Sequence, residues 1–264
     1  MSLSFRHLIV ALTGIAALSS AAAVQANQTF DFSTPVVTGA TQSPGVWYTD
    51  RYAPAGFSSP VSFDGGDRLL QSISAADGAS SRPGPFSSAF YNTQGRKYDL
   101  EAATVKMSID LYVPAAWQST NARMAGFWGT GVDNTDAVSS YPILEFTSDS
   151  ATPRFRGWEA DGSWIDLGLP TGFAYNTWQT LEITKLPSGE FNYAVGDKSA
   201  TTLLMGPATT EIANVILQGH NSQAGVSYDI HWDNLATSVV PEPASAAMAG
   251  VAVLGLLAAR RRRA

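Results

Sequence analysis

Alternation of apolar and polar residues is the clearest pattern along the chain. Between Thr104 and Val113, every second residue is apolar: Val105, Met107, Ile109, Leu111 and Val113. Lys106, Ser108, Asp110 and Tyr112 lie between them. A period of two over ten residues predicts a long strand with one buried face.

Shorter segments of the same kind, bounded by Gly, Asp, Asn, Ser or Pro, predict further strands. They cover residues 29–32, 36–38, 68–73, 87–92, 123–129, 141–147, 153–158, 164–167, 177–185, 190–195, 213–220 and 226–235. Residues 160–163 and 187–189 have the Asp-Gly or Gly chemistry of hairpin turns, whereas 44–60 and 75–85 read as irregular. About a dozen strands without a convincing helix predict an all-β, two-sheet sandwich.

Two segments resemble a known family of sandwiches. A strand that begins at Trp178 is followed by one that contains Tyr193-Ala194-Val195-Gly196, as in concanavalin A-like jelly rolls, the lectin, laminin-G and glucanase superfamily. The closing Asp233-Asn234-Leu235 is similar to the end of many carbohydrate-binding sandwiches. The resemblance implies a jelly roll whose last strand pairs with an N-terminal strand such as 29–32, and we expect Trp178 and Trp232 in its core.

The N-terminus has the pattern of a secretory signal peptide. Arg6 and His7 precede an apolar run from Leu8 to Leu18, and small residues lead to Val24-Gln25-Ala26. This order of a positive, an apolar and an A-x-A-like segment predicts cleavage before Asn27. The sequence therefore divides into a signal peptide at 1–26 and an exported remainder.

The C-terminus has three parts in a fixed order. A rigid break at Val240-Pro241-Glu242-Pro243 precedes an apolar run from Ala244 to Ala259. Four arginines follow: Arg260, Arg261, Arg262 and Arg263. Sixteen helical residues cover about 24 Å, short against a hydrocarbon core of roughly 30 Å, so arginine snorkelling and local thinning have to cover the rest. Clustered arginine beside a single transmembrane helix predicts a cytoplasmic C-terminus.

This tripartite end resembles the PEP-CTERM sorting signal of Gram-negative bacteria that make exopolysaccharide. In that signal a Pro-Glu-Pro motif, a short transmembrane helix and a basic tail are read and cut by an exosortase. The resemblance implies a sorting signal over 239–264, with the motif at 240–243, the helix at 244–259 and the tail at 260–263. The alternative is an ordinary C-terminal anchor that is never cleaved.

Composition limits what residues 27–238 can be. Without Arg6, the tail arginines and Glu242, 21 acidic residues stand against 11 basic ones. This balance argues against nucleic acid as a partner, since phosphate binding needs a basic face. The chain has no cysteine, so disulfides do not stabilise this exported domain. One β-sandwich domain fits the length.

The residues for a catalytic centre are sparse. There are three histidines, and no phosphate loop or Gly-x-Ser-x-Gly elbow. A glycosidase needs two carboxylates across a groove, yet neither Glu145 with Asp149 nor Glu159 with Asp161 has the glucanase spacing. A lyase remains an alternative. Gln218-Gly219-His220 loosely resembles the Gln-x-His strand of jelly-roll alginate lyases, but the tyrosine-bearing strand of that family is missing.

A binding role requires less. Arg154, Arg156 and Trp158 share strand parity, and Trp164 returns across the hairpin. With Gln218 and His220 they are the predicted ligand-binding residues, because sugars stack on aromatic rings and accept hydrogen bonds from planar side chains. The alternative is that the tryptophans are core and the arginines pair with nearby carboxylates. No catalytic residue is assigned.

No cofactor is required, but a structural calcium ion is predicted at Asp31 and Asp233, where related sandwiches hold one. The expected partners are the Sec translocon, signal peptidase, the inner membrane in a transient stage, exosortase and an exopolysaccharide. The sequence thus favours a non-enzymatic polysaccharide-binding protein of the cell surface or extracellular matrix. An enzyme on the same fold and a structural matrix protein without ligand are the alternatives.

Overall fold

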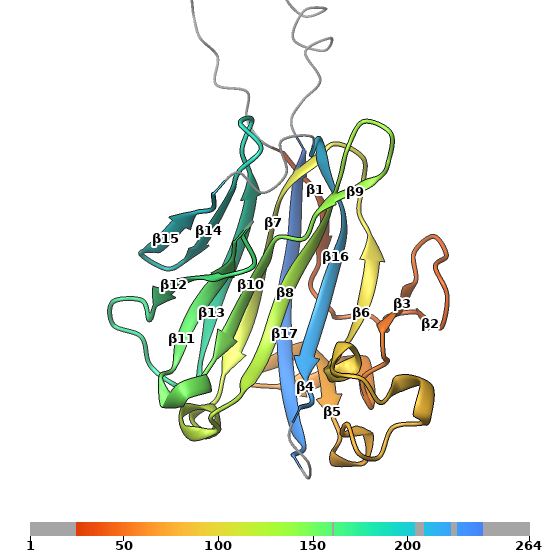
Figure 1. The fold of residues 1–264 in the computed structure, drawn as a ribbon, viewed down its shortest axis with the longest axis vertical. Coiled ribbons are helices and arrows are strands. Elements are labelled where there is room, and N and C mark those ends of the chain that lie inside the picture. Colours follow the sequence, from red (N-terminus) through yellow and green to blue (C-terminus); the bar gives the residue numbers. More distant parts are fainter. Residues whose placement is uncertain (1–24, 160, 204–208, 223–225, 240–264) are drawn as a thin grey trace, which may run out of the picture.

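Two sheets that lie one behind the other make up the fold (Figure 1). A computed structural model describes residues 25–159, 161–203, 209–222 and 226–239. Within these ranges the strands pair antiparallel, apart from one short parallel pair and an isolated bridge, into an eight-stranded and a nine-stranded sheet. The predicted all-β, two-sheet jelly-roll sandwich is confirmed.

The first sheet, called sheet A here, has the order β15-β14-β13-β7-β17-β5-β4, and β1 pairs with the end of β17. The bounds of its strands are β1 (Gln25–Phe30), β4 (Gly56–Phe63), β5 (Gly66–Ile73), β7 (Thr104–Val113), β13 (Thr177–Lys185), β14 (Phe191–Val195), β15 (Lys198–Thr201) and β17 (Tyr228–Val239).

The second sheet, sheet B, has the order β12-β11-β10-β8-β16-β6-β3-β2, and β9 pairs with β8. Its strands are β2 (Thr38–Gly39), β3 (Trp47–Arg51), β6 (Thr93–Asp99), β8 (Arg123–Val132), β9 (Val138–Ser140), β10 (Ile143–Thr147), β11 (Arg154–Trp158), β12 (Trp164–Gly168) and β16 (Glu211–His220). The helices of the described residues are short 3-10 turns: η1 (Ala75–Asp77), η2 (Gly84–Phe86), η3 (Ala89–Asn92), η4 (Ala115–Ser119) and η5 (Asp149–Ala151).

The core lies between the sheets and follows the alternation of the strands. On β7 the apolar residues Met107, Ile109, Leu111 and Val113 are fully buried. They belong to one cluster with Phe127, Leu144, Phe146, Phe155 and Leu217 of sheet B. A strand such as β7 therefore turns one face inward and leaves the other partly exposed, whereas β8 and β10 of sheet B are buried on both faces.

The two predicted core tryptophans differ. Trp232 is buried in the core, and its Nε1 donates to Gln71 Oε1 at 3.1 Å. The prediction for Trp178 was wrong, because Trp178 pairs with Tyr112 on the outer face of sheet A and its Nε1 donates to Asp64 Oδ2 at 2.7 Å. Leu181 and Ile183 are the inward residues of that strand.

Two local predictions also need correction. Residues 44–60 are not irregular, since they contain β3 and the start of β4. Trp47 and Tyr48 are consecutive and both buried, which hides any period of two. Residues 87–92 end in the 3-10 turn η3, and the strand starts only at Thr93. Their rings pack locally, with Tyr91 centred 5.0 Å from Phe86 and 5.1 Å from Phe90.

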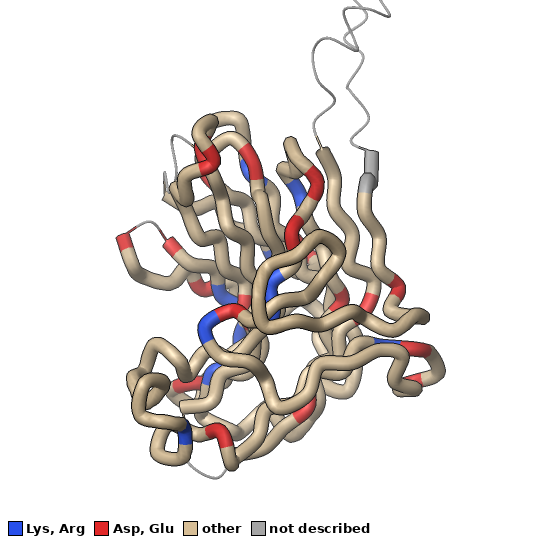
Figure 2. Tube along the Cα trace, turned by 90° about the vertical axis from the view of Figure 1, so that its right-hand side faces the viewer, with Lys and Arg blue, Asp and Glu red and all other residues tan. Residues whose placement is uncertain are grey.

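The closing strand pairs with the N-terminal one as predicted. In β1 and β17, Thr29 lies opposite Ala236 and Phe30 opposite Leu235. The start of β1 and the end of β17 therefore lie side by side at one end of the sandwich, as two perpendicular views show (Figures 1 and 2).

Candidate functional site

A second apolar cluster lies on the outer face of sheet B, apart from the core. It is centred on Trp128, Ile143 and Ile216, which are buried, and the half-buried Trp158 and Trp164 pack against it. Trp158 and Trp164 are direct partners across the β11–β12 hairpin. Their ring centroids are 4.8 Å apart at an interplanar angle of 73°. Aromatic rings are thus gathered on the sheet face that does not form the core.

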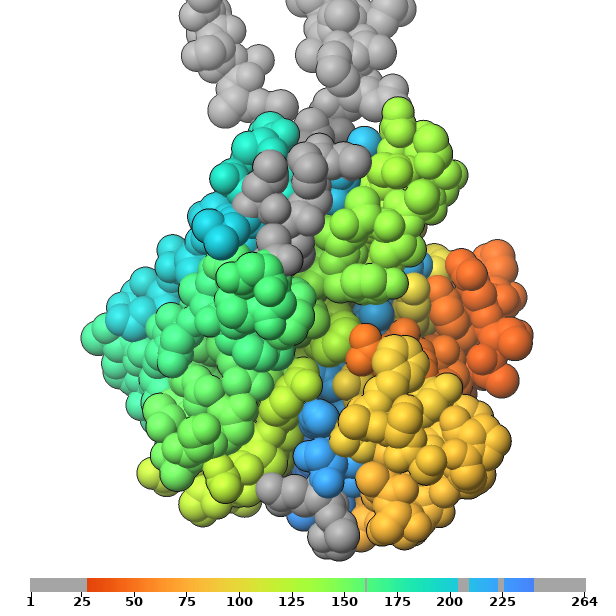
Figure 3. All heavy atoms as spheres, in the orientation of Figure 1, coloured from red at the N-terminus to blue at the C-terminus, as the bar shows by residue number. Residues whose placement is uncertain are grey.

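Two adjoining hollows run over this cluster. One, of about 310 Å³, is lined by Arg51, Arg123, Trp128, Tyr141, Ile143, Trp158 and Trp164. The other, of about 430 Å³, is lined by Asp50, Arg51, Phe86, Phe90, Tyr91, Lys97, Trp128, Tyr141 and Ile216. Because they share Arg51, Trp128 and Tyr141, we treat them as one groove. In Figure 3 the gold segment and the green strands rise on either side of it.

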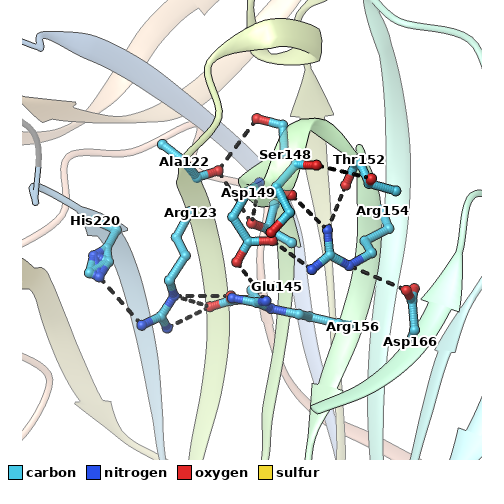
Figure 4. A network of polar contacts seen from close by, with 12 residues as sticks. Ala122, Arg123, Glu145, Ser148, Asp149, Thr152, Arg154, Arg156, Asp166 and His220 are labelled. Carbon is cyan, nitrogen blue, oxygen red and sulfur yellow. Dashed lines mark hydrogen bonds and ion pairs between the residues drawn. The ribbon is translucent and has the colours of Figure 1, made fainter.

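A buried carboxylate lies beside the groove (Figure 4). Glu145 on β10 is 1% exposed. Its Oε2 is 2.7 Å from Arg123 Nη2, and its Oε1 is 2.7 Å from Arg156 Nη2. Charge-assisted contacts of this kind fix both guanidinium groups in place.

The network continues across β11 to β12. Arg156 Nη1 lies 2.7 Å from Asp149 Oδ2, and Arg154 Nη2 lies 2.5 Å from Asp149 Oδ1. Arg154 Nε is 3.3 Å from Asp166. Burial acts to raise the pKa of Asp149, but Arg156 and Arg154 hold that pKa below its usual value. Arg154 and Arg156 are therefore paired with carboxylates, the alternative that the sequence left open for them.

The arginines also cover aromatic faces. The guanidinium carbon of Arg156 is 4.1 Å from the ring centroid of Trp164, and that of Arg123 is 5.3 Å from it. Arg51 lies 4.7 Å from the centroid of Trp128 and 4.6 Å from that of Phe90. Such cation–π contacts orient the rings that line the groove.

Gln218 lies beneath the groove and does not line it. The side chain is 1% exposed. In the amide orientation that gives both its oxygen and its nitrogen a partner, Oε1 accepts from Trp128 Nε1 at 3.2 Å and Nε2 donates to the carbonyl of Gly219. A Cβ at position 126 would lie 2.0 Å from one end of the Gln218 amide and 2.6 Å from Trp128 Nε1, so only glycine fits there. Gln218 thus positions Trp128.

His220, like Gln218, is not among the residues that line the groove. Arg123 Nη1 lies 3.4 Å from His220 Nε2, and the buried Nδ1 has no hydrogen-bond partner. Burial and the nearby arginines, Arg123 first among them, lower the pKa of His220 to about 3. The ring is therefore neutral near physiological pH and accepts a hydrogen bond from Arg123.

One wall of the groove comes from a segment whose role the sequence did not indicate. Arg82 is 5% exposed and donates to the carbonyls of Asp77, Phe86, Ser88 and Asn221 and to Asn92 Oδ1. These bonds fold residues 77–92 into the ridge that carries Phe86, Phe90 and Tyr91. Buried arginine donors need acceptors, and backbone carbonyls supply most of them here.

Of the predicted calcium residues, Asp233 lies on β17, an inner strand of sheet A, and Asp31 follows the end of β1. Asp233 Oδ2 is 2.7 Å from Arg68 Nη1, while Asp31 Oδ1 accepts from the backbone and hydroxyl of Ser33. In the described part of the chain, no three His, Cys, Asp or Glu side chains are grouped as metal ligands would be. Calcium binding at this pair stays a prediction.

The ends of the chain carry the remaining predicted sites. The signal peptide up to residue 24, the motif Val240, Pro241, Glu242 and Pro243, the helix at 244–259 and Arg260 to Arg263 lie outside the described residues. Among the residues that are described, no helix is long and apolar enough to cross a membrane.

Comparison with protein families identifies the C-terminal segment. Residues 239–263 match the PEP-CTERM protein-sorting motif. The PEP-CTERM motif implies export, membrane-anchored sorting and processing by exosortase, as the sequence predicted. No curated protein matches this sequence.

Solved structures similar to this chain include two glucan-related proteins and a lyase. A Bacillus licheniformis β-glucanase is 13% identical, with a TM-score of 0.46 over 76% of this chain and 95% of its own. A Bacteroides ovatus mixed-linkage glucan GH16 protein is 11% identical, with a TM-score of 0.47 over 79% and 98%. An alginate lyase from Chlorella virus is 13% identical, with a TM-score of 0.45 over 74% and 93%. Glucanases were among the relatives that the sequence resemblance named, and these similarities do not bear on activity.

Proposed function

We propose that this exported protein binds a polysaccharide in the groove over sheet B. The observation that carries the proposal is the row of rings along that groove: Phe90, Tyr91, Trp128, Tyr141, Trp158 and Trp164. Tyr141 and Phe90 are 47% and 57% exposed, so their faces are open to a ligand. Extended sugars use such rings for stacking and use planar polar groups beside them for hydrogen bonds.

The polar groups beside the rings favour binding over catalysis. Glu145 is held by two arginines and His220 accepts from Arg123, so both groups fix arginines beside the rings. The arginines in turn are held rigidly, which limits the entropy that binding costs. A preformed aromatic groove with fixed donors is the arrangement of a binding protein.

The same proposal includes the route to the cell surface. The chain leaves the cytoplasm through the Sec translocon, and signal peptidase cuts before Asn27. The protein then stays in the inner membrane through residues 244–259, with its folded part in the periplasm, until exosortase acts at Pro241-Glu242-Pro243. The final place is the cell surface or the extracellular matrix.

Affinity electrophoresis of the exported form in gels that contain neutral or uronic acid polysaccharides tests the binding. We expect retardation in at least one gel, and Trp158→Ala or Trp164→Ala should weaken it about fivefold to tenfold, the worth of one stacked ring. Trp178→Ala is the matched control, because Trp178 is a half-buried tryptophan on the outer face of sheet A. Loss of retardation in the control as well, or no retardation by any polysaccharide, would contradict the proposal. Ultraviolet-absorbing unsaturated product in the same incubations would instead favour the lyase.

A further inference from the structure

The pairing of β1 with β17 brings the two ends of the described chain together. Gln25 lies opposite Val239 and Ala26 opposite Ser238. The ladder then shifts register before Thr29 pairs with Ala236. Residues on either side of this irregularity are thus held in two separate stretches of the same ladder.

The predicted signal-peptide cleavage falls at this irregularity. A cut between Ala26 and Asn27 removes Gln25 and Ala26, and with them the partners of Val239 and Ser238. The rest of β1 is held independently. Gln28 Oε1 accepts from the backbone of Glu101 at 3.1 Å, and the Phe30 ring packs 5.1 Å from Tyr98. Cleavage therefore strips the first pairs and leaves the rest of the strand in place.

The opposite edge of β17 stays occupied. There Ser238 pairs with Lys106 and Val239 with Thr104 on β7, and Thr104 is buried. After cleavage, Ser238 and Val239 are accordingly held extended by β7, while their other edge has lost its strand partner. The sorting motif begins at Val240, the next residue.

We propose that this edge of β17, uncovered when Gln25 and Ala26 leave, is where the exosortase adds a strand to reach the motif. Extended peptides commonly bind partners by adding to an open strand edge, whose free backbone groups supply the hydrogen bonds. Removal of the signal peptide thereby precedes and permits sorting. The inference rests on the proposed export and processing, and concerns the order and the surface of the second cut.

Two variants of the full chain, expressed in cells that contain the exosortase, distinguish the effect of backbone pairing with β17 from the effect of a retained N-terminal membrane anchor. Ala26→Leu removes the small residue that signal peptidase needs and leaves the backbone able to pair. The double variant Gln25→Pro with Ala26→Pro also lacks that small residue, and its two prolines have no N–H to donate to the ladder. Both retain the signal peptide, so both stay anchored at the N-terminus.

Pulse-chase labelling with intact mass follows the loss of the C-terminal segment. We expect the C-terminal segment to be lost about tenfold more slowly in Ala26→Leu than in the wild type, because the two backbone pairs still cover the edge of β17. The double proline variant cannot form these pairs, so its rate should be within about threefold of the wild-type rate. Equal rates in Ala26→Leu and wild type would overturn the inference, as would equal slowing in both variants. A wild-type protein that keeps its C-terminus overturns the proposed sorting itself, and this is seen before any variant is compared.

Discussion

Arg156 and Glu145 form a buried ion pair on the outer face of sheet B. Arg156 Nη2 lies 2.7 Å from Glu145 Oε1, and its Nε donates to the same oxygen at 2.9 Å. The other oxygen of Glu145, Oε2, lies 2.7 Å from Arg123 Nη2. The buried carboxylate of Glu145 thus joins the two guanidinium groups that contact Trp164, and Asp149 is a second carboxylate partner of Arg156.

Glu145→Gln should therefore be costly. The amide keeps the shape but removes the carboxylate that Arg123 pairs with, and it leaves Arg156 with Asp149 alone. Breaking a buried pair costs about 3 kcal/mol or more. Urea unfolding at neutral pH measures this loss as a lower midpoint. Asp166→Asn is the control, since Asp166 is 59% exposed and 3.3 Å from Arg154, and such a surface pair contributes about 0.5 kcal/mol. Similar midpoints for the two variants would contradict the role of Glu145.

The fold was predictable where apolar and polar residues alternate along a strand. β7 and β13 have the bounds that the sequence predicts, because one face of each is buried and the other is polar. β6 was missed for a physical reason. Its inward residues include Gln94 and Arg96, which are satisfied by backbone carbonyls of Asp77, Gly39 and Trp47, so the strand shows no apolar period.

The site was predictable only in part. Parity placed Arg154, Arg156 and Trp158 on one face, where the structure has them. Arg123 was missed because strict alternation from Phe127 would turn it inward. An irregularity in the β8–β10 pairing places Met124 and Ala125 both in the core and brings Arg123 to Glu145. Contributions from distant segments, such as Arg51 and Phe90, leave no signal in local sequence.

Gly157 is expected to tolerate no side chain. A Cβ at this position would lie 2.1 Å from the ring of Tyr193. That tyrosine is fully buried, and its hydroxyl donates to the carbonyl of Trp158 and accepts from the backbone of Ile143. Gly157→Ala should cost about 1–3 kcal/mol by overpacking, measured by thermal unfolding.

Gly84→Ala is the control for that substitution. No atom lies within 4 Å of a Cβ at Gly84, so its melting temperature should stay close to that of the wild type. Unchanged stability in Gly157→Ala would show that the Tyr193 ring can move, and would contradict the prediction.

The calcium prediction now depends on Arg68. Its Nη1 lies 2.7 Å from Asp233 Oδ2, so calcium must displace this cation to reach the carboxylate. We expect calcium, compared with chelator, to raise the melting temperature more in Arg68→Gln than in wild type. Saturation at about 100 times Kd contributes about 2.7 kcal/mol, a rise of several degrees. If calcium raises the melting temperature of neither protein, the predicted calcium site is wrong.

His220 should make stability depend on pH. Burial, Arg123 on β8, Arg156 on β11, Arg51 on β3 and Arg82 lower its folded pKa from 6.5 to about 3. Between these values the unfolded chain binds a proton that the folded chain does not. Stability is therefore full above the unfolded pKa and falls as pH drops below it, by at most about 1.4 kcal/mol per pH unit.

Urea unfolding at several pH values between about 5 and 7.5 measures this slope. We expect His220→Gln to flatten it. His231→Gln is the matched control, because His231 is half-buried and its pKa is also lowered by burial, yet no arginine is among the causes. Asp50 and Asp233, whose pKa values are raised by burial, act with the opposite sign and equally in both variants. If the slope persists in His220→Gln and disappears in His231→Gln, the pH dependence arises at sheet A and the position of His220 beside the groove plays no part in it.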